Sequence, residues 1–379
     1  MKKFSFIIPV YNNWKLLKNT LEALNYQEGF CREDYEVVIV DDGSDDDTLS
    51  YIRVVNRNYS LKYIFLERCK DSCAARARNY GWRNADGEVI VFIDADIIVR
   101  SNYLKELERY YSKDRNILVI GSRLMLKEDI TVDGIQDKSV FEKYTFTWER
   151  PELHEFRYQI FDENSFNASA LKCPWLMSFT CNMSMYKCWL EKIDGFDENF
   201  KCWGLEDVEL SLRLYLAGIK IVINSKLEVM HQFHGTGNDK ISPEKYSGID
   251  KNVDYFLSKH PNALEMPNDE VHALFKGKDF NYSNINENIS KIEVLNLKNR
   301  DKLEELKNAI VMLTEDENVV VIINDYVEDV DLDLWIQFLD ERKTVPLYFT
   351  ASRRSIGAEI RNLDVLSRNG ELSVTITDY

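Results

Sequence analysis

Two aspartates, Asp94 and Asp96, are well placed to do chemistry because they directly follow the apolar run VIVFI at residues 89–93. Side chains two positions apart on an extended strand point the same way, so both carboxylates would converge beyond the strand's end. Two hard oxygen anions so close together repel unless a cation lies between them, and Mg²⁺ or Mn²⁺ is the natural one. Such a metal would hold a diphosphate. The alternative, a solvated strand end, is the ordinary explanation for an isolated Asp-x-Asp pair.

Two further segments belong near these aspartates. Asp42 follows the apolar run at residues 36–40, where a carboxylate can accept a hydrogen bond from a base or a ribose hydroxyl. The same Asp-Asp-Gly-Ser stretch is also a good turn and helix cap. Arg76 and Arg78 precede the Asp-x-Asp strand and can neutralise phosphate oxygens, or they are simply surface residues on a helix.

A third group of candidates lies after residue 200. Glu206 and Asp207 follow Trp203-Gly204 and begin a predicted helix, where the helix dipole stabilises carboxylates and one of them can act as a general base. Plain N-capping explains the acids but not the Trp-Gly pair. His231 and His234 follow a short apolar run, and a histidine beside two carboxylates favours Mn²⁺ over Ca²⁺. A lone histidine is more often structural.

Alternating strands and helices must position these residues. Apolar runs at residues 4–10, 36–40, 61–66 and 89–93 are separated by helical patterns at 14–26, 48–56 and 74–84. Apolar strands alternating with helices indicate a parallel sheet covered on both faces, hence an α/β fold. Residues 115–260 are more irregular, with a helix predicted at 206–217 and a strand at 219–223. A second alternation has strands at 292–297, 319–325, 345–350 and 372–378, with helices near 301–314 and 331–341.

The chain length and composition favour two globular domains. The chain has 379 residues, of which 45% are hydrophobic and 30% charged. We predict a domain over residues 1–260 with halves 1–114 and 115–260, a linker over 261–290 and a small α/β domain over 291–379. A formal net charge of −16 argues against nucleic acid as a partner. The sequence has no apolar run of spanning length, which predicts no transmembrane segment and a place in the cytoplasm, or peripherally at the inner face of the membrane.

Six motifs in order resemble those of family-2 glycosyltransferases of the GT-A fold. They are PVYNN at 9–13, VDDGSDD at 40–46, ARN at 77–79, DAD at 94–96, WGLEDVE at 203–209 and His231. The resemblance covers roughly residues 1–260. Its second half is similar to the galactosyltransferase-like part of chondroitin-polymerase-type, β-1,4-galactosyltransferase and polypeptide N-acetylgalactosaminyltransferase enzymes. Residues 291–379 resemble nothing in it.

The resemblance implies a role for each motif. The uracil and ribose of a UDP-sugar would be held by Pro9, Tyr11, Asn12 and Asp42, with Arg78 near the diphosphate. The metal, Mn²⁺ or else Mg²⁺, would be bound by Asp96 and His231, with Asp94 bridging between ribose and metal and His234 as the second choice of histidine. Asp207 would be the catalytic base and Glu206 would bind acceptor or donor sugar, with Trp203 and Gly204 lining their pocket. Leu205 departs from the family, which often has a second glycine there.

The implied activity is transfer of a sugar from a UDP-sugar to a hydroxyl acceptor. The Glu206–Asp207 pair favours inversion, because the retaining polypeptide N-acetylgalactosaminyltransferases lack an acid at the second position. The acceptor is expected to be a growing surface polysaccharide or, second, a peptide. Two rival classes are a sugar-nucleotide pyrophosphorylase, whose Gly-rich loop is absent after the first strand, and a non-catalytic sugar-nucleotide or glycan-binding module. The small domain is expected to contact a protein or peptide acceptor, or to mediate assembly.

Overall fold

The fold is described from a computed structural model, in which the chain divides into two compact units. One comprises residues 1–155 and 175–280, the other residues 156–174 and 281–379. The structure describes residues 2–54, 57–145, 150–163, 173–234, 243–276, 291–313, 319–327, 347–351 and 373–379, with single positions 166, 168, 171, 332 and 335. The predicted division at residues 260 and 290 stays a prediction.

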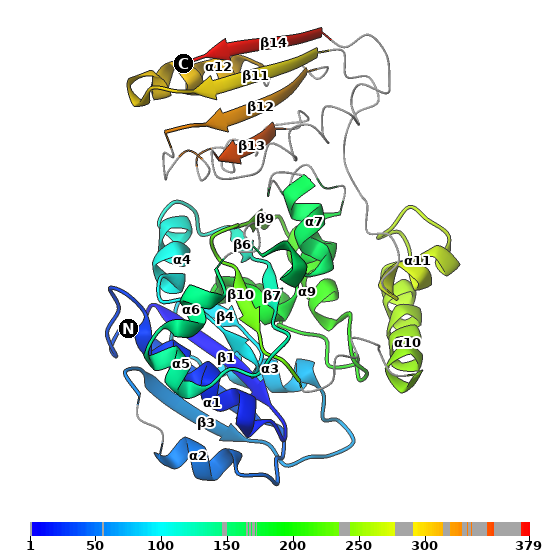
Figure 1. Cartoon of the computed structure of the whole chain (residues 1–379). Helices are drawn as coiled ribbons and strands as arrows, with labels where there is room; N and C mark the ends of the chain where they lie inside the picture. The colour runs from blue at the N-terminus through cyan, green and yellow to red at the C-terminus, as the bar shows by residue number, and fades with distance from the viewer. Residues whose placement is uncertain are drawn as a thin grey trace. The chain divides into compact units, whose positions relative to one another are not determined.

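A seven-stranded sheet with the order β3-β2-β1-β4-β8-β6-β9 forms the centre of the first unit (Figure 1). Its strands are β1 (Phe4–Val10), β2 (Tyr35–Asp41), β3 (Ser60–Phe65), β4 (Val89–Phe92), β6 (Ile117–Ile120), β8 (Met183–Tyr186) and β9 (Lys220–Ile223). Only β8 runs antiparallel to its neighbours, so the predicted mostly parallel α/β sheet is confirmed. Sequence alone left β6 and β8 unassigned, although β4 and β9, which are equally short, were predicted.

Helices α1 (Trp14–Ala23) and α3 (Ala74–Arg83) cover opposite faces of this sheet. α3 packs so closely that a Cβ on Gly81 would lie 2.3 Å from Cγ2 of Ile7, so only glycine fits there. Phe6 points to the other face, where it contacts Tyr35, whose hydroxyl donates to the Leu24 carbonyl just after α1. The C-terminal parts of both helices therefore pack against β1 and β2.

Short elements complete the first unit. Helices α2 (Thr48–Val54), α4 (Tyr103–Tyr111), α5 (Val132–Gln136), α6 (Ser139–Lys143), α8 (Lys187–Ile193) and α9 (Glu206–Leu216) lie between the strands. A second sheet has the order β5-β10-β7, formed by β5 (Ile97–Ile98), β10 (Val229–His231) and β7 (Arg123–Met125). Its apolar side chains, Ile98, Leu124 and Met230, join a buried cluster with Ala23 of α1. The small sheet is thereby fixed beside α1.

Helix α10 (Pro243–Lys259) is tied to α9 by a buried carboxylate. Glu209 is fully buried and accepts hydrogen bonds from Arg213 at 2.9 Å, Lys259 at 2.6 Å and His260 at 3.0 Å. Helix α11 (Asn268–Phe275) follows and is held to α10 by His272, which contacts Asp250 at 2.8 Å. The segment expected to be a linker, residues 261–290, thus contains a helix, and the remainder after residue 276 lies outside the described residues.

The second unit has a four-stranded, fully parallel sheet with the order β13-β12-β11-β14. The strands are β11 (Lys291–Leu297), β12 (Val319–Asp325), β13 (Leu347–Ala351) and β14 (Ser373–Asp378), close to the four predicted ones. Helix α12 (Leu303–Leu313) buries Leu306 and Ile310 against this sheet, and α7 (Phe156–Glu163) also belongs to the unit. Most of the helix predicted at 331–341 lies outside the described residues.

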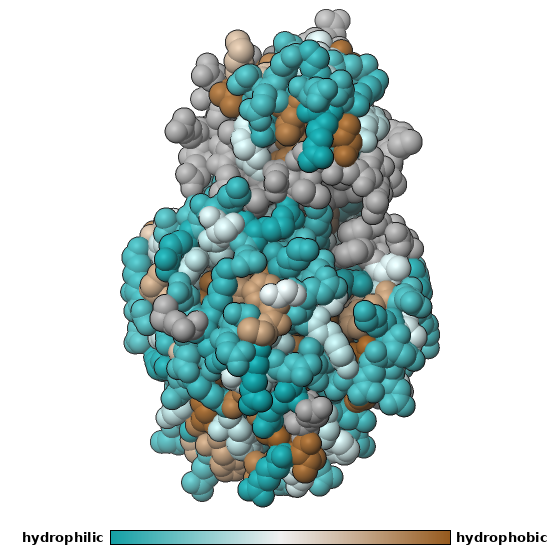
Figure 2. Space-filling model, turned by 90° about the vertical axis from the view of Figure 1, so that its left-hand side faces the viewer, coloured by the Kyte–Doolittle hydropathy of each residue, from teal (hydrophilic) through white to brown (hydrophobic). Residues whose placement is uncertain are grey.

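The described residues on one face of the molecule are mostly polar. The face shown in Figure 2 is predominantly hydrophilic, with hydrophobic groups in small separate areas. Among the described residues, no helix combines the length and the apolar character that crossing a membrane would require.

Candidate active site

The candidate site lies at the edge of the central sheet where β1, β2 and β4 end. These strands are parallel neighbours, so their carboxyl ends meet at one edge, the place where open α/β sheets bind ligands. The segments that follow the strands carry the predicted residues Tyr11 and Asn12, Asp42, and Asp94 and Asp96.

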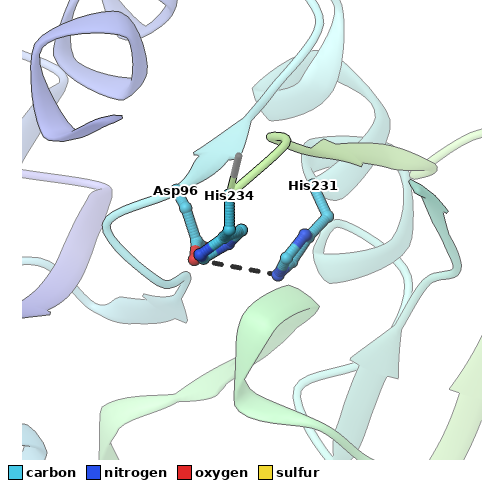
Figure 3. Close-up of side chains that lie close together, drawn as sticks. All are labelled: Asp96, His231 and His234. Atoms are coloured by element: carbon cyan, nitrogen blue, oxygen red, sulfur yellow. Dashed lines mark ion pairs between the residues drawn. The ribbon is translucent and has the colours of Figure 1, made fainter. Parts of the chain in front are cut away.

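The small sheet brings a distant histidine segment to this edge. β10 pairs antiparallel with β5, with His231 opposite Ile97, one residue after Asp96. As a result the Nε2 atoms of His234 and His231 lie 3.0 Å and 3.7 Å from Oδ2 of Asp96, and the two imidazole rings stack at 4.9 Å (Figure 3). One ligand atom from each of the three side chains lies within 4.8 Å of the others, a spacing that a single metal ion can bridge.

The donors of this cluster suit a divalent transition metal. Oδ1 of Asp96 is buried and, among the described residues, has no hydrogen-bond partner. Burial opposes ionisation of Asp96, but the hydrogen bond with His234 and the charges of both histidines and Arg123 hold its pKa below the usual value. Burial lowers the pKa of His231, which favours the neutral imidazole that binds metal. A carboxylate with two imidazoles is a donor set that fits Mn²⁺ better than the oxygen-preferring Mg²⁺.

Asp94 lies outside this cluster. Its Oδ1 pairs with the Arg78 guanidinium at 3.0 Å, and the other arm of Arg78 pairs with Glu206 at 2.9 Å. Burial lowers the pKa of Arg78, but the charges of Asp94, Glu206 and Asp207 outweigh this effect, so the guanidinium stays charged. Arg78 therefore joins the end of β4 to the start of α9. The guanidinium that was expected to lie near the diphosphate is paired with two carboxylates in this structure.

Asp207 occupies the first turn of α9 with its carboxylate held in place. Its Oδ2 accepts from the Thr180 backbone N–H at 3.3 Å and its Oδ1 from the N–H of Val208 at 2.9 Å. Burial and the neighbouring charge of Glu206 raise its pKa to about 7, although Arg78 acts in the opposite direction. A carboxylate with a pKa near neutrality can both accept a proton and release it at physiological pH.

A tight turn directly before α9 positions Glu206 and Asp207. Gly204 and Leu205 both have left-handed backbone angles, with φ of 92° and 73°, directly before α9 begins at Glu206. Glycine adopts left-handed backbone angles without cost. For Leu205 they are unfavourable, and its side chain is buried. Trp203 precedes the turn with 54% of its surface exposed, as a face on which a sugar ring could stack.

The predicted nucleotide residues lie on the other half of the sheet edge. Pro9 lies in β1 opposite Val40 of β2. Asn12 connects the loops after these strands: its N–H donates to Ser44 Oγ at 2.9 Å, and its side-chain oxygen accepts from the N–H of Asp45 at 2.9 Å. These hydrogen bonds join the two loops, and the predicted contact of Asn12 with the nucleotide stays a prediction.

Sequence reasoning missed Arg68, which contacts two of the predicted nucleotide residues. Its guanidinium lies 3.7 Å from the centre of the Tyr11 ring and 2.8 Å from Oδ2 of Asp42. Arg76 approaches the other oxygen of Asp42 at 3.4 Å. A base that stacks on Tyr11 would have to share that ring with Arg68. The residue lies in a loop without a motif, so the sequence offered no signal for it.

Arg123 was also missed. This partly buried residue of β7 donates to Glu155 at 3.0 Å, and its positive charge helps to lower the pKa of Asp96. Because β7 has only three residues, its sequence shows no period that would have indicated a strand or its inward face.

Comparison with known proteins agrees with this architecture. Residues 5–173 match the family model described as glycosyl transferase family 2, and residues 163–235 match one described as the N-terminal domain of galactosyltransferase. The fold is similar to that of S. aureus TarS 1–349 in complex with UDP-GlcNAc, with a TM-score of 0.50 and 19% identity over 83% of this chain and 80% of that one.

Two curated relatives share part of their length with the chain. Validoxylamine A glucosyltransferase of Streptomyces hygroscopicus subsp. jinggangensis is 29% identical over 268 residues, which cover 69% of this chain and 61% of the relative. Chondroitin synthase of Pasteurella multocida is 30% identical over 230 residues, which cover 56% of this chain and 23% of the relative. The chain thus spans less than two thirds of the length of either relative.

The fold is of the GT-A class, a mixed α/β fold with a mostly parallel central sheet. The chain is a glycosyltransferase that carries a family 2 domain over residues 5–173, and the family resemblance predicted from its motifs is confirmed. The role of each predicted site residue stays a prediction.

Proposed function

We propose that the protein transfers a sugar from a UDP-sugar to a hydroxyl group of a saccharide acceptor, with inversion and with a divalent metal, Mn²⁺ rather than Mg²⁺. The observation that carries the proposal is the meeting, at one sheet edge, of the Asp96–His231–His234 cluster with the start of α9, where Asp207 lies. The match of part of the chain to chondroitin synthase supports a saccharide as the acceptor, with a peptide as the alternative.

Each residue has a defined task in the proposed reaction. Tyr11 and Asp42 hold the uracil and ribose of the donor, and Asp96, His231 and His234 would hold the metal. When bound, the metal would supply positive charge to the diphosphate of the donor. Glu206 has a buried oxygen, Oε2, that has no hydrogen-bond partner among the described residues, and this oxygen is available to a sugar hydroxyl.

Transfer then requires one proton movement and one exchange of bonds. Asp207 accepts the proton of the acceptor hydroxyl, and the acceptor oxygen forms a bond to the anomeric carbon from the face opposite the diphosphate. The bond from that carbon to the diphosphate oxygen breaks, and UDP leaves with the electron pair. A single displacement of this kind inverts the configuration of the anomeric carbon.

The decisive experiment measures UDP release from a panel of UDP-sugars without acceptor, in Mn²⁺ and in EDTA. Hydrolysis of one donor in Mn²⁺ and none in EDTA would establish the donor, its sugar and the metal requirement together. UDP binding without release would indicate either strict acceptor dependence or a non-catalytic binding module, which adding saccharide acceptors would separate. A protein that binds no UDP in either condition would contradict the proposal.

The raised pKa of Asp207 predicts a pH dependence. A general base must be deprotonated, so kcat/KM for the acceptor should rise with pH through about 7 and then level off. At pH 6, kcat/KM should be about ten-fold below the plateau, because the deprotonated fraction of Asp207 falls about ten-fold for each pH unit below its pKa. The profile is measured at saturating Mn²⁺ and donor, so that metal binding does not contribute. A profile that stays flat from pH 5.5 to 8 would rule out this assignment.

The second unit, with its parallel sheet, has no place in this mechanism. A role for residues 291–379 in binding an acceptor or a protein partner remains a prediction from the sequence.

A further inference from the structure

The candidate metal cluster is assembled from two segments far apart in the sequence. Asp96 belongs to the turn after β4, whereas His231 and His234 flank the end of β10. The backbone pairs of the two strands join them only at Met230–Ile98 and His231–Ile97. β10 is also paired with β7, but Asp96 and residues 232–234 lie beyond the paired positions, and side chains supply further restraints there.

Gln232 supplies these restraints from a position between the two histidines. Its side chain is buried, with 2% of its surface exposed. Its Oε1 accepts from Nδ2 of Asn19 at 2.8 Å, and its Nε2 donates to the Leu16 carbonyl at 3.0 Å and to Thr20 Oγ1 at 3.3 Å. All three partners lie on α1, so this amide fixes the histidine segment to that helix.

The same helix also holds the aspartate turn. The Thr20 hydroxyl, which accepts from Gln232, donates to the carbonyl of Ala95 at 2.8 Å. The backbone N–H of Gln232 in turn donates to the carbonyl of Asp96 at 3.0 Å. Thr20 and Gln232 therefore connect both parts of the cluster to one rigid helix and to each other.

The chemistry of an amide is needed at this position. Gln232 donates two hydrogen bonds and accepts one, which a carboxylate cannot do because it has no donor, and which an apolar side chain cannot do at all. Burying a polar side chain is unfavourable unless its partners are present, and here they are. An apolar side chain of similar size would fill the same space but would fix neither segment.

We infer that Gln232, acting through Thr20, is a positioning residue that holds the aspartate and histidine ligands at the separation one metal ion requires. The inference rests on the proposed function, because it assumes that the Asp96–His231–His234 cluster binds a metal. Partners that orient metal ligands from behind typically contribute about 10–100-fold to metal affinity.

The test compares Mn²⁺ binding by the full chain carrying Gln232→Met or Gln27→Met, with free Mn²⁺ measured by its electron paramagnetic resonance signal. Gln27 is a matched control: it is also a buried glutamine, its Nε2 donates to Arg100 at 3.0 Å and its Oε1 accepts from Leu104 at 3.1 Å, and neither partner belongs to the cluster. Gln232→Met should weaken Mn²⁺ binding about 10–100-fold and Gln27→Met by less than about two-fold. Turnover of Gln232→Met should recover when Mn²⁺ is raised.

The outcomes separate this inference from the function on which it rests. Wild-type affinity in Gln232→Met, or an equal loss in Gln27→Met, would overturn the positioning role and leave the metal site standing. Wild-type protein that binds no Mn²⁺ would overturn the metal site and the inference together. If Gln232→Met does not fold, Thr20→Val carries the same test, because it removes only the hydroxyl that joins Gln232 to Ala95.

Discussion

Replacing Asp207 with asparagine is expected to lower kcat by about 10²-fold or more while UDP affinity stays within about two-fold of wild type. Asparagine keeps the size of the side chain and an oxygen that can accept from the Thr180 N–H, but its amide nitrogen cannot accept from the Val208 N–H as the carboxylate does. It cannot accept the proton of the acceptor hydroxyl. Steady-state kinetics with acceptor, together with UDP titration by calorimetry, measure the two quantities separately.

Glu209 provides the control for this substitution. It lies two residues further along α9 and is fully buried, but its carboxylate is occupied by Arg213, Lys259 and His260. Glu209→Gln should lower the melting temperature and leave kcat per folded molecule nearly unchanged. Parallel loss of UDP binding and turnover in Asp207→Asn would mean that Asp207 shapes the site and is not its base.

Replacing Asp96 with alanine is expected to abolish Mn²⁺-dependent UDP binding. The substitution removes the only carboxylate of the cluster and the partner of both His231 and His234, so Mn²⁺ affinity should fall by at least about 100-fold. The same protein in EDTA and the wild type in EDTA should bind UDP equally weakly. Calorimetry with UDP, with and without Mn²⁺, provides the measurement. Unchanged Mn²⁺-dependent affinity in Asp96→Ala would contradict the proposed metal site.

Asp94→Asn separates the two aspartates of the Asp-x-Asp pair. In the structure Asp94 pairs with Arg78 and lies outside the cluster, so its substitution should reduce Mn²⁺ affinity far less than Asp96→Ala does. Equal losses would mean that Asp94 is a ligand as well, the role that the family resemblance implied. His231→Ala and His234→Ala, measured in the same way, would rank the two histidines.

Much of the fold could be predicted because its strongest signals are local. The mostly apolar runs at residues 4–10, 36–40 and 89–93 form β1, β2 and β4, since a strand buried on both faces is rich in apolar residues. The helix predicted at 206–217 is α9, because the helical period and the acidic first turn are both contained in one segment. The helix α11 was missed because Pro261 and Pro267 favoured a linker.

The site could be predicted only in part, because many of its contacts join residues that are far apart in the sequence. The sequence indicated which residues could do chemistry, and the order of the motifs indicated the family. It gave no means of seeing that Arg68 lies over Tyr11, or that Gln232 contacts Thr20, because those pairs are distant in the chain and none of these contacts follows from local periodicity.

By itself, therefore, the sequence determined the strands and helices between residues 4 and 92, the family and the candidate residues, because propensity and hydrophobic period are properties of neighbouring residues. The tertiary structure alone decided which side chains meet. Pairing of β5 with β10 placed His231 and His234 beside Asp96. The buried Arg78 forms ion pairs with Asp94 and with Glu206, the first residue of α9. Such choices depend on how distant segments pack and share charge in three dimensions, and no local pattern in the chain encodes them.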